Sequence, residues 1–295
     1  MQTQETKTPL FDYDVAFSRN IGWVTEDEQR TLRSKKVVIG GLGGVGGSHL
    51  ITLSRLGIGS FHISDLDSFD VANFNRQYGA SMSTLGKDKA EVMEEIIRDI
   101  NPEIKLKNFK KGISDENLEE FLEGADIYVD SLDIFALDIR RKVFARCYEK
   151  GIPTITAAPM GMGTAILVFL PGKMSFDDYF CLDGYGFEDQ LIKFVIGVSP
   201  SLLQRDYIVA KNTVNFLKQK VPSTSMGIEI SAGTACTNVL KLLLNRGNVI
   251  HAPHGLHFDA YRNKLVKTWR PWGNNNPVQR FMFWRAKKFL EEHNS

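Results

Sequence analysis

A cluster of glycines between two regular segments is the clearest chemical signal in the sequence. Residues 41–46 read Gly-Leu-Gly-Gly-Val-Gly, which matches G-x-G-x-x-G, with a β-branched run before it and a helical pattern after it. Glycine lets the backbone approach a phosphate, and the start of the next helix offers free N–H groups and a positive dipole end. We therefore predict a nucleotide-binding loop at Gly41, Gly43, Gly44 and Gly46. A purely structural role for these glycines is the alternative, and the lack of Lys-Ser or Lys-Thr after them argues against a Walker A loop.

Charged and amide side chains follow the next predicted strand. Asp65 and Asp67 lie at its end, and Asp65 is placed to accept hydrogen bonds from ribose hydroxyls, which alone would indicate NAD. Two amides and two cations come further along the chain: Asn73, Asn75, Arg76 and Lys89. Such a group can surround a triphosphate and offset its charge, which favours ATP over a nicotinamide cofactor.

One more acid follows a later strand. Asp133 comes just after residues 126–130, at the carboxyl edge where ligands of parallel sheets bind. An acid beside a triphosphate can hold Mg²⁺. We predict that Asp133 binds Mg²⁺, with capping of the following helix as the alternative role.

The elements that position these residues are predicted from periodicity. Strand patterns cover residues 36–40, 60–65, 104–109, 126–130, 153–157 and 164–170. Helical patterns lie between them, over residues 49–56, from about 87 to Pro102, in a short acidic helix that Ser114 caps, and from 136 to Gly151. This alternation predicts an α/β fold with a doubly wound, mostly parallel Rossmann-like sheet and helices on both faces.

The regular pattern breaks after Pro171. Residues 172–226 show helical signals only near 189–196 and 207–220, so we expect a long crossover insertion. A helix over 229–245, a hairpin turning at Arg262-Asn263 and a basic, aromatic amphipathic helix after Asn274 follow. The predicted parts are an N-terminal helical arm (1–35), an ATP-binding Rossmann-like domain (36–170), a crossover segment (171–228) and a C-terminal helix, hairpin and tail that complete the same domain (229–295).

Composition excludes several classes of protein. The 295 residues are 43% hydrophobic and 24% charged, as in globular proteins, and 36 basic against 35 acidic residues argue against a dedicated nucleic-acid binder. The three cysteines are scattered without a C-x-x-C pair, which excludes a disulfide framework and a cysteine-based zinc site. The polar N-terminus and the absence of a long apolar run lead us to expect a cytoplasmic protein with no signal peptide and no membrane span.

This succession of motifs resembles the ThiF/MoeB/HesA family, the bacterial relatives of ubiquitin-activating E1 enzymes. The motifs are GLGGVG, SDLD, NFNRQ, GKDKAE with INP after it, and VDSLD, and the resemblance resumes at the 229–245 helix and the FDAYRNKL hairpin. It implies adenylation of a carboxylate, in which the carboxylate attacks the α-phosphate of Mg-ATP and pyrophosphate leaves. It also implies that Asp65 binds ribose, Arg76 and Lys89 hold phosphates, Asn73 and Asn75 line the site, and Asp133 binds Mg²⁺.

The resemblance extends to the N-terminal arm. Phe17-Ser18-Arg19-Asn20-Ile21 is similar to the family's R-Q-I segment, whose arginine reaches the ATP site of the partner subunit. This implies a homodimer in which Arg19 completes the opposite site. An ordinary surface cation is the alternative.

The sequence departs from the family in three places. The family's paired C-x-x-C motifs are missing, so no zinc is expected, and Pro253 and Gly255 interrupt the HxxHxxH spacing of His251, His254 and His257. The crossover segment before residue 229 carries only Cys181, a weak candidate for a thioester, so the chemistry is expected to stop at an acyl-adenylate or to pass it directly to another nucleophile. Arg140 and Arg141 follow Asp133 later than the family's arginine and either replace it or face solvent.

The expected function is that of an E1-like, ATP-dependent adenylyltransferase. Its substrate would be the C-terminal carboxylate of a small ubiquitin-like or sulfur-carrier protein, or of a peptide. Three alternatives stay open: a tRNA-modifying dehydratase of the same family, an NAD-dependent oxidoreductase, and a nucleotide-binding partner protein that has lost catalysis. The basic tail with Arg280, Arg285, Lys287 and Lys288 favours the tRNA alternative, unless it packs on the body through Phe281, Trp284 and Phe289.

Overall fold

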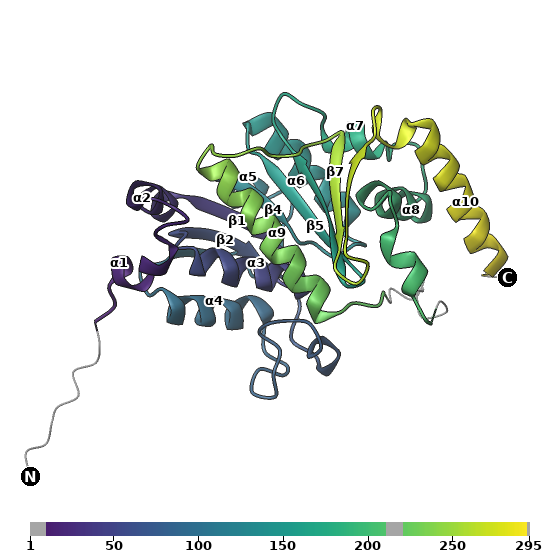
Figure 1. Ribbon diagram of the computed structural model, residues 1–295. Coiled ribbons are helices and arrows are strands. Elements are labelled where there is room, and N and C mark those ends of the chain that lie inside the picture. The colour runs from purple at the N-terminus through teal and green to yellow at the C-terminus, as the bar shows by residue number, and fades with distance from the viewer. Residues whose placement is uncertain (1–9, 211–220, 294–295) are drawn as a thin grey trace, which may run out of the picture.

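The computed structural model describes residues 10–210 and 221–293, with side chains as far as residue 288. Within these residues, eight strands form one sheet in the order β3-β2-β1-β4-β5-β6-β7-β8 (Figure 1). The strands are β1 (Lys36–Gly40), β2 (Ser60–Ser64), β3 (Lys105–Asn108), β4 (Ile127–Asp130), β5 (Thr154–Met160), β6 (Gly163–Phe169), β7 (His254–Asp259) and β8 (Lys264–Trp269). Strands β1 to β5 pair in parallel, whereas β6, β7 and β8 pair antiparallel. The predicted α/β fold with a mostly parallel sheet is confirmed.

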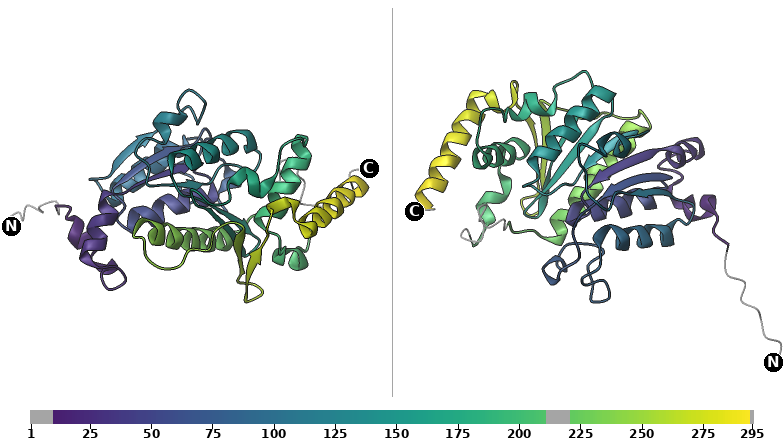
Figure 2. Two further views of the ribbon diagram at one scale, coloured as in Figure 1. Left: turned by 90° about the horizontal axis from the view of Figure 1, so that it is seen from above. Right: turned by 180° about the vertical axis from the view of Figure 1, so that it is seen from behind.

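Helices cover both faces of the sheet (Figures 1 and 2). The helices of the described residues are α1 (Tyr13–Ala16), α2 (Glu26–Ser34), α3 (Gly44–Arg55), α4 (Lys89–Ile100), α5 (Leu118–Phe121), α6 (Leu137–Lys150), α7 (Phe176–Phe180), α8 (Phe187–Val198), α9 (Ser225–Leu243) and α10 (Pro277–His293). None of the described helices is both long enough and apolar enough to cross a membrane.

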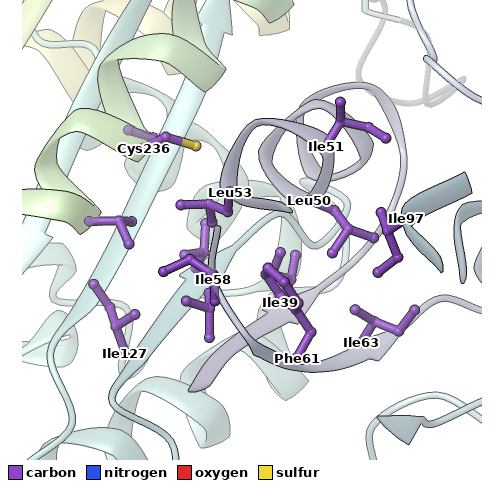
Figure 3. Close-up of a cluster of buried hydrophobic side chains, with 14 of the residues drawn as sticks. Ile39, Leu50, Ile51, Leu53, Ile58, Phe61, Ile63, Ile97, Ile127 and Cys236 are labelled. Carbon is purple, nitrogen blue, oxygen red and sulfur yellow. The ribbon is translucent and has the colours of Figure 1, made fainter. Parts of the chain in front are cut away.

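Alternation along each strand divides the core in two. Val37 and Ile39 of β1 face α3, α4 and α9, and Figure 3 shows this cluster with Ile39 close to Leu50 of α3. Val38 points to the other face, where it joins the apolar side chains of α5 to α8. Because successive side chains of a strand alternate, one short β-branched run serves both layers.

Several predicted boundaries move. The first helix after the glycines begins at Gly44 rather than at residue 49, so it starts inside the glycine cluster. Ser114 does not cap the short acidic helix, because that helix begins only at Leu118 and the Asn117 side chain accepts the Ser114 N–H. Of the two helical signals in the crossover segment, the first is confirmed as α8. The second falls mostly on residues 211–220, outside the described residues.

The N-terminal arm packs at the far end of α3. Tyr13 donates to the carbonyl of Gly57, and Asn20 and Gln29 both donate to the carbonyl of Leu56. A capping box between Thr25 and Glu28 begins α2. These contacts place the arm at the amino edge of the sheet, and Figure 2 shows the arm and α10 at opposite ends of the molecule.

Candidate active site

The glycine cluster forms the turn between β1 and α3. Gly41 has φ +87°, and a Cβ there would lie 2.2 Å from the carbonyl oxygen of Ser131. A Cβ on Gly46 would lie 2.0 Å from the carbonyl oxygen of Gly41. A Cβ on Gly43, by contrast, would meet nothing closer than Gln77 Nε2 at 3.8 Å. The first and last glycines are therefore required by packing, whereas the space above Gly43 at the start of α3 is open to a ligand.

Asp65 organises this turn from the end of β2. Its Oδ2 accepts the N–H of Leu42 at 2.6 Å, and its Oδ1 accepts the N–H of Asp67 at 2.8 Å. Burial raises the pKa of Asp65 above its usual value, and the two N–H bonds oppose that shift. A carboxylate has about four acceptor positions, so Asp65 keeps capacity to bind a hydroxyl group.

Lys89 lies beside Asp65, at the start of α4. Its Nζ is 2.9 Å from Asp67 Oδ2, and its side chain is 6% exposed whereas that of Asp67 is 72% exposed. The N–H of Lys89 also donates to the carbonyl of Asp67 at 2.9 Å. Asp67 thus holds the lysine at the carboxyl edge, and an arriving phosphate would compete for the same ammonium group.

Arg76 approaches the beginning of α3 from the other side. A Cβ on Gly44 would lie 3.6 Å from Arg76 Cγ. Arg76 Nη1 donates to the carbonyl of Ala72 at 2.8 Å and to Asn75 Oδ1 at 2.9 Å. Because the guanidinium group has five N–H donors, these two bonds leave it able to bind phosphate oxygens.

The two predicted amides have mainly structural contacts. Asn75 Nδ2 donates to the carbonyl of Ser223 at 3.0 Å, which ties this loop to the crossover segment just before α9. Asn73 Oδ1 accepts the N–H of Asp70 at 3.0 Å in a capping box. Asn75 thus contacts Arg76, whereas Asn73 stabilises the turn at Asp70 and does not bond Arg76 through its side chain in the described contacts.

Asp133 lies on the loop that follows β4 and touches the glycine turn. This loop approaches the turn at Ser131, whose carbonyl lies against Gly41. The Asp133 side chain is exposed, and its Oδ1 accepts the N–H of Phe135 at 2.9 Å. The predicted alternative, that Asp133 caps the following helix, is wrong, because the N-cap of α6 is Ala136 and no side chain caps that helix.

The number of carboxylates at this edge decides which kind of metal site the residues could form. No group of three or more His, Cys, Asp or Glu side chains in the described residues is arranged to hold a metal ion. Mg²⁺ is usually bound through one or two carboxylates together with nucleotide phosphates and water. A single exposed carboxylate, that of Asp133, on the loop that meets the glycine turn is compatible with that donor set.

Two charged groups are buried at this edge, of which the sequence prediction missed Asp130 and left open whether Arg140 faces solvent. Asp130, at the end of β4, and Arg140 of α6 form an ion pair of 2.9 Å, with side chains 1% and 3% exposed. The neighbouring Arg141 instead bonds Asp177 and Asp183. The expectation that both arginines could face solvent is wrong for Arg140. The available signal was an acid at the end of an apolar strand, which needs a buried partner.

Arg19 is far from the glycine turn of its own chain. It lies in a short 3₁₀ helix (Ser18–Asn20) whose last residue bonds Leu56, just after the end of α3. The twelve residues of α3 separate that end from the glycine turn by about 18 Å. The structure therefore does not bring Arg19 together with Arg76, Lys89 and Asp133 within one chain.

The remaining sequence candidates are dispersed. Cys181 ends α7 with φ +50°, and burial raises its pKa, which disfavours the reactive thiolate. The ring of His254 stacks on Trp269, whereas His257 is buried with its Nδ1 2.7 Å from Ser201 Oγ. Cys147 and Cys236 are buried in the core.

Comparison with known proteins identifies relatives of two activities. The tRNA threonylcarbamoyladenosine dehydratase of Bacillus subtilis is 34% identical over 142 residues, which are 48% of this chain and 55% of that protein. The sulfur carrier protein ThiS adenylyltransferase of Escherichia coli is 29% identical over 145 residues, which are 49% of this chain and 57% of that protein. The aligned part is thus about half of this chain and little more than half of these curated relatives.

Solved structures share the fold. MccB of Escherichia coli with ATP has a TM-score of 0.63 at 21% identity, covering 85% of this chain and 68% of that one. PaaA has a TM-score of 0.66 at 17% identity, covering 91% and 77%. The model of the ThiF family matches residues 17–280. With the glycine turn, the cations and Asp133 at one edge of such a sheet, the chain belongs to the ThiF family.

Proposed function

We propose that the protein is an ATP-dependent adenylyltransferase that activates a carboxylate as an acyl-adenylate. The observation that carries this proposal is the charge at the carboxyl edge. Lys89 and Arg76 flank the glycine turn, with Asp65 behind it and Asp133 on the adjoining loop. Two cations of this kind suit a triphosphate better than the single pyrophosphate of NAD, which argues against an oxidoreductase.

Each group has a defined task in this reaction. The N–H groups at the start of α3 bind phosphate oxygens, and Asp65 binds the ribose. A carboxylate oxygen of the substrate forms a bond to the α-phosphorus, while the bond to the bridging oxygen breaks and its electron pair leaves with pyrophosphate. Arg76 and Lys89 stabilise the charge that collects on the phosphate oxygens. Mg²⁺, held by Asp133, supplies further charge neutralisation when bound.

The substrate class we propose is the C-terminal carboxylate of a small carrier protein or peptide. Support comes from a relative whose name specifies such a partner, the sulfur carrier protein ThiS adenylyltransferase of Escherichia coli. No described cysteine has the environment of a thioester nucleophile, so the adenylate is the expected product or is passed directly to another nucleophile.

The second candidate is a tRNA-modifying dehydratase. It is favoured by the 34% identity to the Bacillus subtilis enzyme and by α10, which exposes Phe281 and Trp284 beside Arg280 and Arg285. Aromatic and basic side chains together can bind nucleic acid. Pyrophosphate exchange that depends on a peptide, compared with exchange that depends on tRNA, separates the two candidates.

We also propose a homodimer in which Arg19 of each subunit completes the opposite ATP site. The arm that carries Arg19 exposes apolar side chains, among them Trp23 at 85% and Val15 at 70%. Apolar groups exposed to this degree on one short segment are typical of a contact surface.

A binding measurement followed by one variant tests the activity. Calorimetric titration should show binding of Mg-ATP and no binding of NAD at micromolar concentration. Asp133→Ala should reduce ATP–pyrophosphate exchange by on the order of 100-fold, because it removes the protein's ligand to the metal at a phosphoryl site. Asp138→Ala, which removes an exposed acid from the first turn of α6, is the control and should leave exchange unchanged. Tight binding of NAD without binding of Mg-ATP would refute the proposal.

A further inference from the structure

A buried ion pair lies directly behind the loop that carries Asp133. Arg140 Nε donates to Asp130 Oδ2 at 2.9 Å, and both side chains are almost fully enclosed. Burying two charges removes them from water, and their attraction and further hydrogen bonds only offset that cost. A buried ion pair therefore adds little net stability. The other hydrogen bonds of Arg140 indicate a further role.

The remaining nitrogens of Arg140 hold the backbone of the loop. Nη1 donates to the carbonyl of Asp133 at 3.1 Å, and Nη2 donates to the carbonyl of Leu132. The planar guanidinium fixes its donors in one geometry, so both carbonyls are set by one side chain. Since Asp133 Oδ1 is in turn bonded to the N–H of Phe135, the position of the carboxylate follows from that of the loop.

The same guanidinium group contacts the crossover segment. Arg140 Cζ lies 4.7 Å from the ring centroid of Phe194 in α8. Phe194 belongs to a cluster of buried aromatic rings that includes Phe176 and Phe180. A cation over an aromatic face is an attractive contact that strengthens when water is excluded. Arg140 therefore contacts both α8 and the Asp133 loop.

We propose that Arg140 is a positioning residue that holds the Asp133 carboxylate for the metal and couples its position to α8 of the crossover segment. The inference rests on the proposed function, because it takes Asp133 as the ligand of Mg²⁺. Lysine could keep the charge pair with Asp130, but its single ammonium group lacks the fixed fork that reaches both carbonyls. If Arg140 positions the loop, its function should require arginine at this position and should not be restored by lysine, which carries the same charge.

Arg140→Lys is the test variant, since removing the charge altogether would leave Asp130 buried without a partner. ATP is titrated calorimetrically into the full chain with Mg²⁺ and again with EDTA. In the variant, the gain in affinity that Mg²⁺ provides should fall by about 10-fold or more, with affinity in EDTA unchanged within about two-fold. Amide hydrogen exchange over residues 132–136, measured without nucleotide, should become faster. Arg141→Lys, the same charge-conserving substitution at the next residue, should alter neither measurement.

Substitutions in α8 test the coupling. Phe194→Leu should shift both measurements in the same direction as Arg140→Lys but by less, whereas Phe176→Leu, in the same aromatic cluster, should not. An Arg140→Lys variant with unchanged loop exchange and an unchanged gain from Mg²⁺ would overturn the inference, even if its melting temperature fell. If the unaltered chain does not bind Mg-ATP, the proposed function fails, and the exchange measurement without nucleotide still decides whether Arg140 holds the loop.

Discussion

Asp130 and Asp133 are two acids three residues apart at the end of one strand, yet their environments differ completely. Asp130 is enclosed and neutralised by Arg140, whereas Asp133 is exposed and has one oxygen bonded to a backbone N–H. A metal ion could reach only Asp133, because the Asp130 carboxylate is enclosed and already forms an ion pair with Arg140. Its position after a predicted strand identified Asp133 as the candidate metal ligand, but only the difference in burial distinguishes it from Asp130.

The glycines of the glycine turn also differ in their surroundings, and a pair of alanine substitutions separates packing from the proposed binding. Gly46→Ala places a methyl group against the Gly41 carbonyl and should cost about 2–4 kcal/mol of unfolding free energy. Gly43→Ala meets no close atom and should change stability by less than about 0.5 kcal/mol, yet should weaken Mg-ATP binding. Urea unfolding and calorimetry measure the two effects. Undiminished ATP affinity in Gly43→Ala would show that the open space is not where the phosphates bind.

His49 makes stability depend on pH. It is fully buried in α3, with Nδ1 3.0 Å from Ser131 Oγ, and burial lowers its pKa to about 3. In the unfolded chain the pKa of His49 is about 6.5, so as pH falls the unfolded state binds the proton before the folded state does. Stability from this residue is therefore complete above about pH 6.5 and is lost as pH falls toward 3, on the order of 1 kcal/mol per pH unit. Urea unfolding between pH 7 and 5 should show a shallower pH slope in His49→Gln, and identical slopes would contradict the assignment.

At the scale of elements, sequence periodicity was enough to predict the strands of the sheet but not all the helices of the crossover segment. The apolar runs of β1, β2, β4, β5 and β6 and the amphipathic helices around them predict these strands, because such runs must be covered on both faces, whereas the edge strand β3 alternates exposed and half-buried residues. The helix α7 went unpredicted, although Ser175 and Asp178 form a capping box, since its five residues are too few for a helical period. Its stability comes from aromatic contacts such as Phe176 on Phe180, which depend on distant chain segments.

The last helix is joined to the crossover segment by a buried amide. Asn274 is 3% exposed, and its Nδ2 donates to the carbonyls of Phe180 and Lys193, while its Oδ1 accepts from Gln279 of α10. Asn274→Ala should cost about 2 kcal/mol of unfolding free energy, because it leaves buried acceptors without their donor. Asn275→Ala, at the exposed next residue, should change unfolding by less than about 0.5 kcal/mol. Equal stability of the two variants in urea would show that α10 does not depend on this amide.

At the scale of the whole molecule, Arg19 is separated from the other candidate site residues of its own chain. The arm sits at the amino edge of the sheet, whereas the glycine turn, Lys89 and Asp133 lie at the carboxyl edge. Motif spacing could predict the edge residues, because parallel strands bring their carboxyl ends together. It could not predict whether Arg19 joins them, since that depends on how two chains meet and not on the fold of one.

The dimer proposal therefore leads to a complementation experiment. An arginine brought across a twofold interface stabilises phosphate charge in the opposite subunit, as an arginine finger does. Arg19→Ala and Asp133→Ala homodimers should each be inactive in pyrophosphate exchange. After mixing with subunit exchange, half of the chains in an equal mixture pair as heterodimers, and each heterodimer contains one site with both wild-type residues. Activity should then recover to roughly a quarter of the wild-type value per chain, assuming independent sites.

Two controls make the outcome decisive. Mass spectrometry of the mixture must show heterodimers, so that a lack of exchange is not mistaken for a lack of complementation. Mixing Lys89→Met with Asp133→Ala should restore nothing, because both residues lie at the same edge of one chain and no heterodimer site would then be intact. Background activity in a mixture of confirmed Arg19→Ala and Asp133→Ala heterodimers would place Arg19 outside the site. A monomer at working concentration would exclude the trans arrangement because no second chain would be present to supply the arginine.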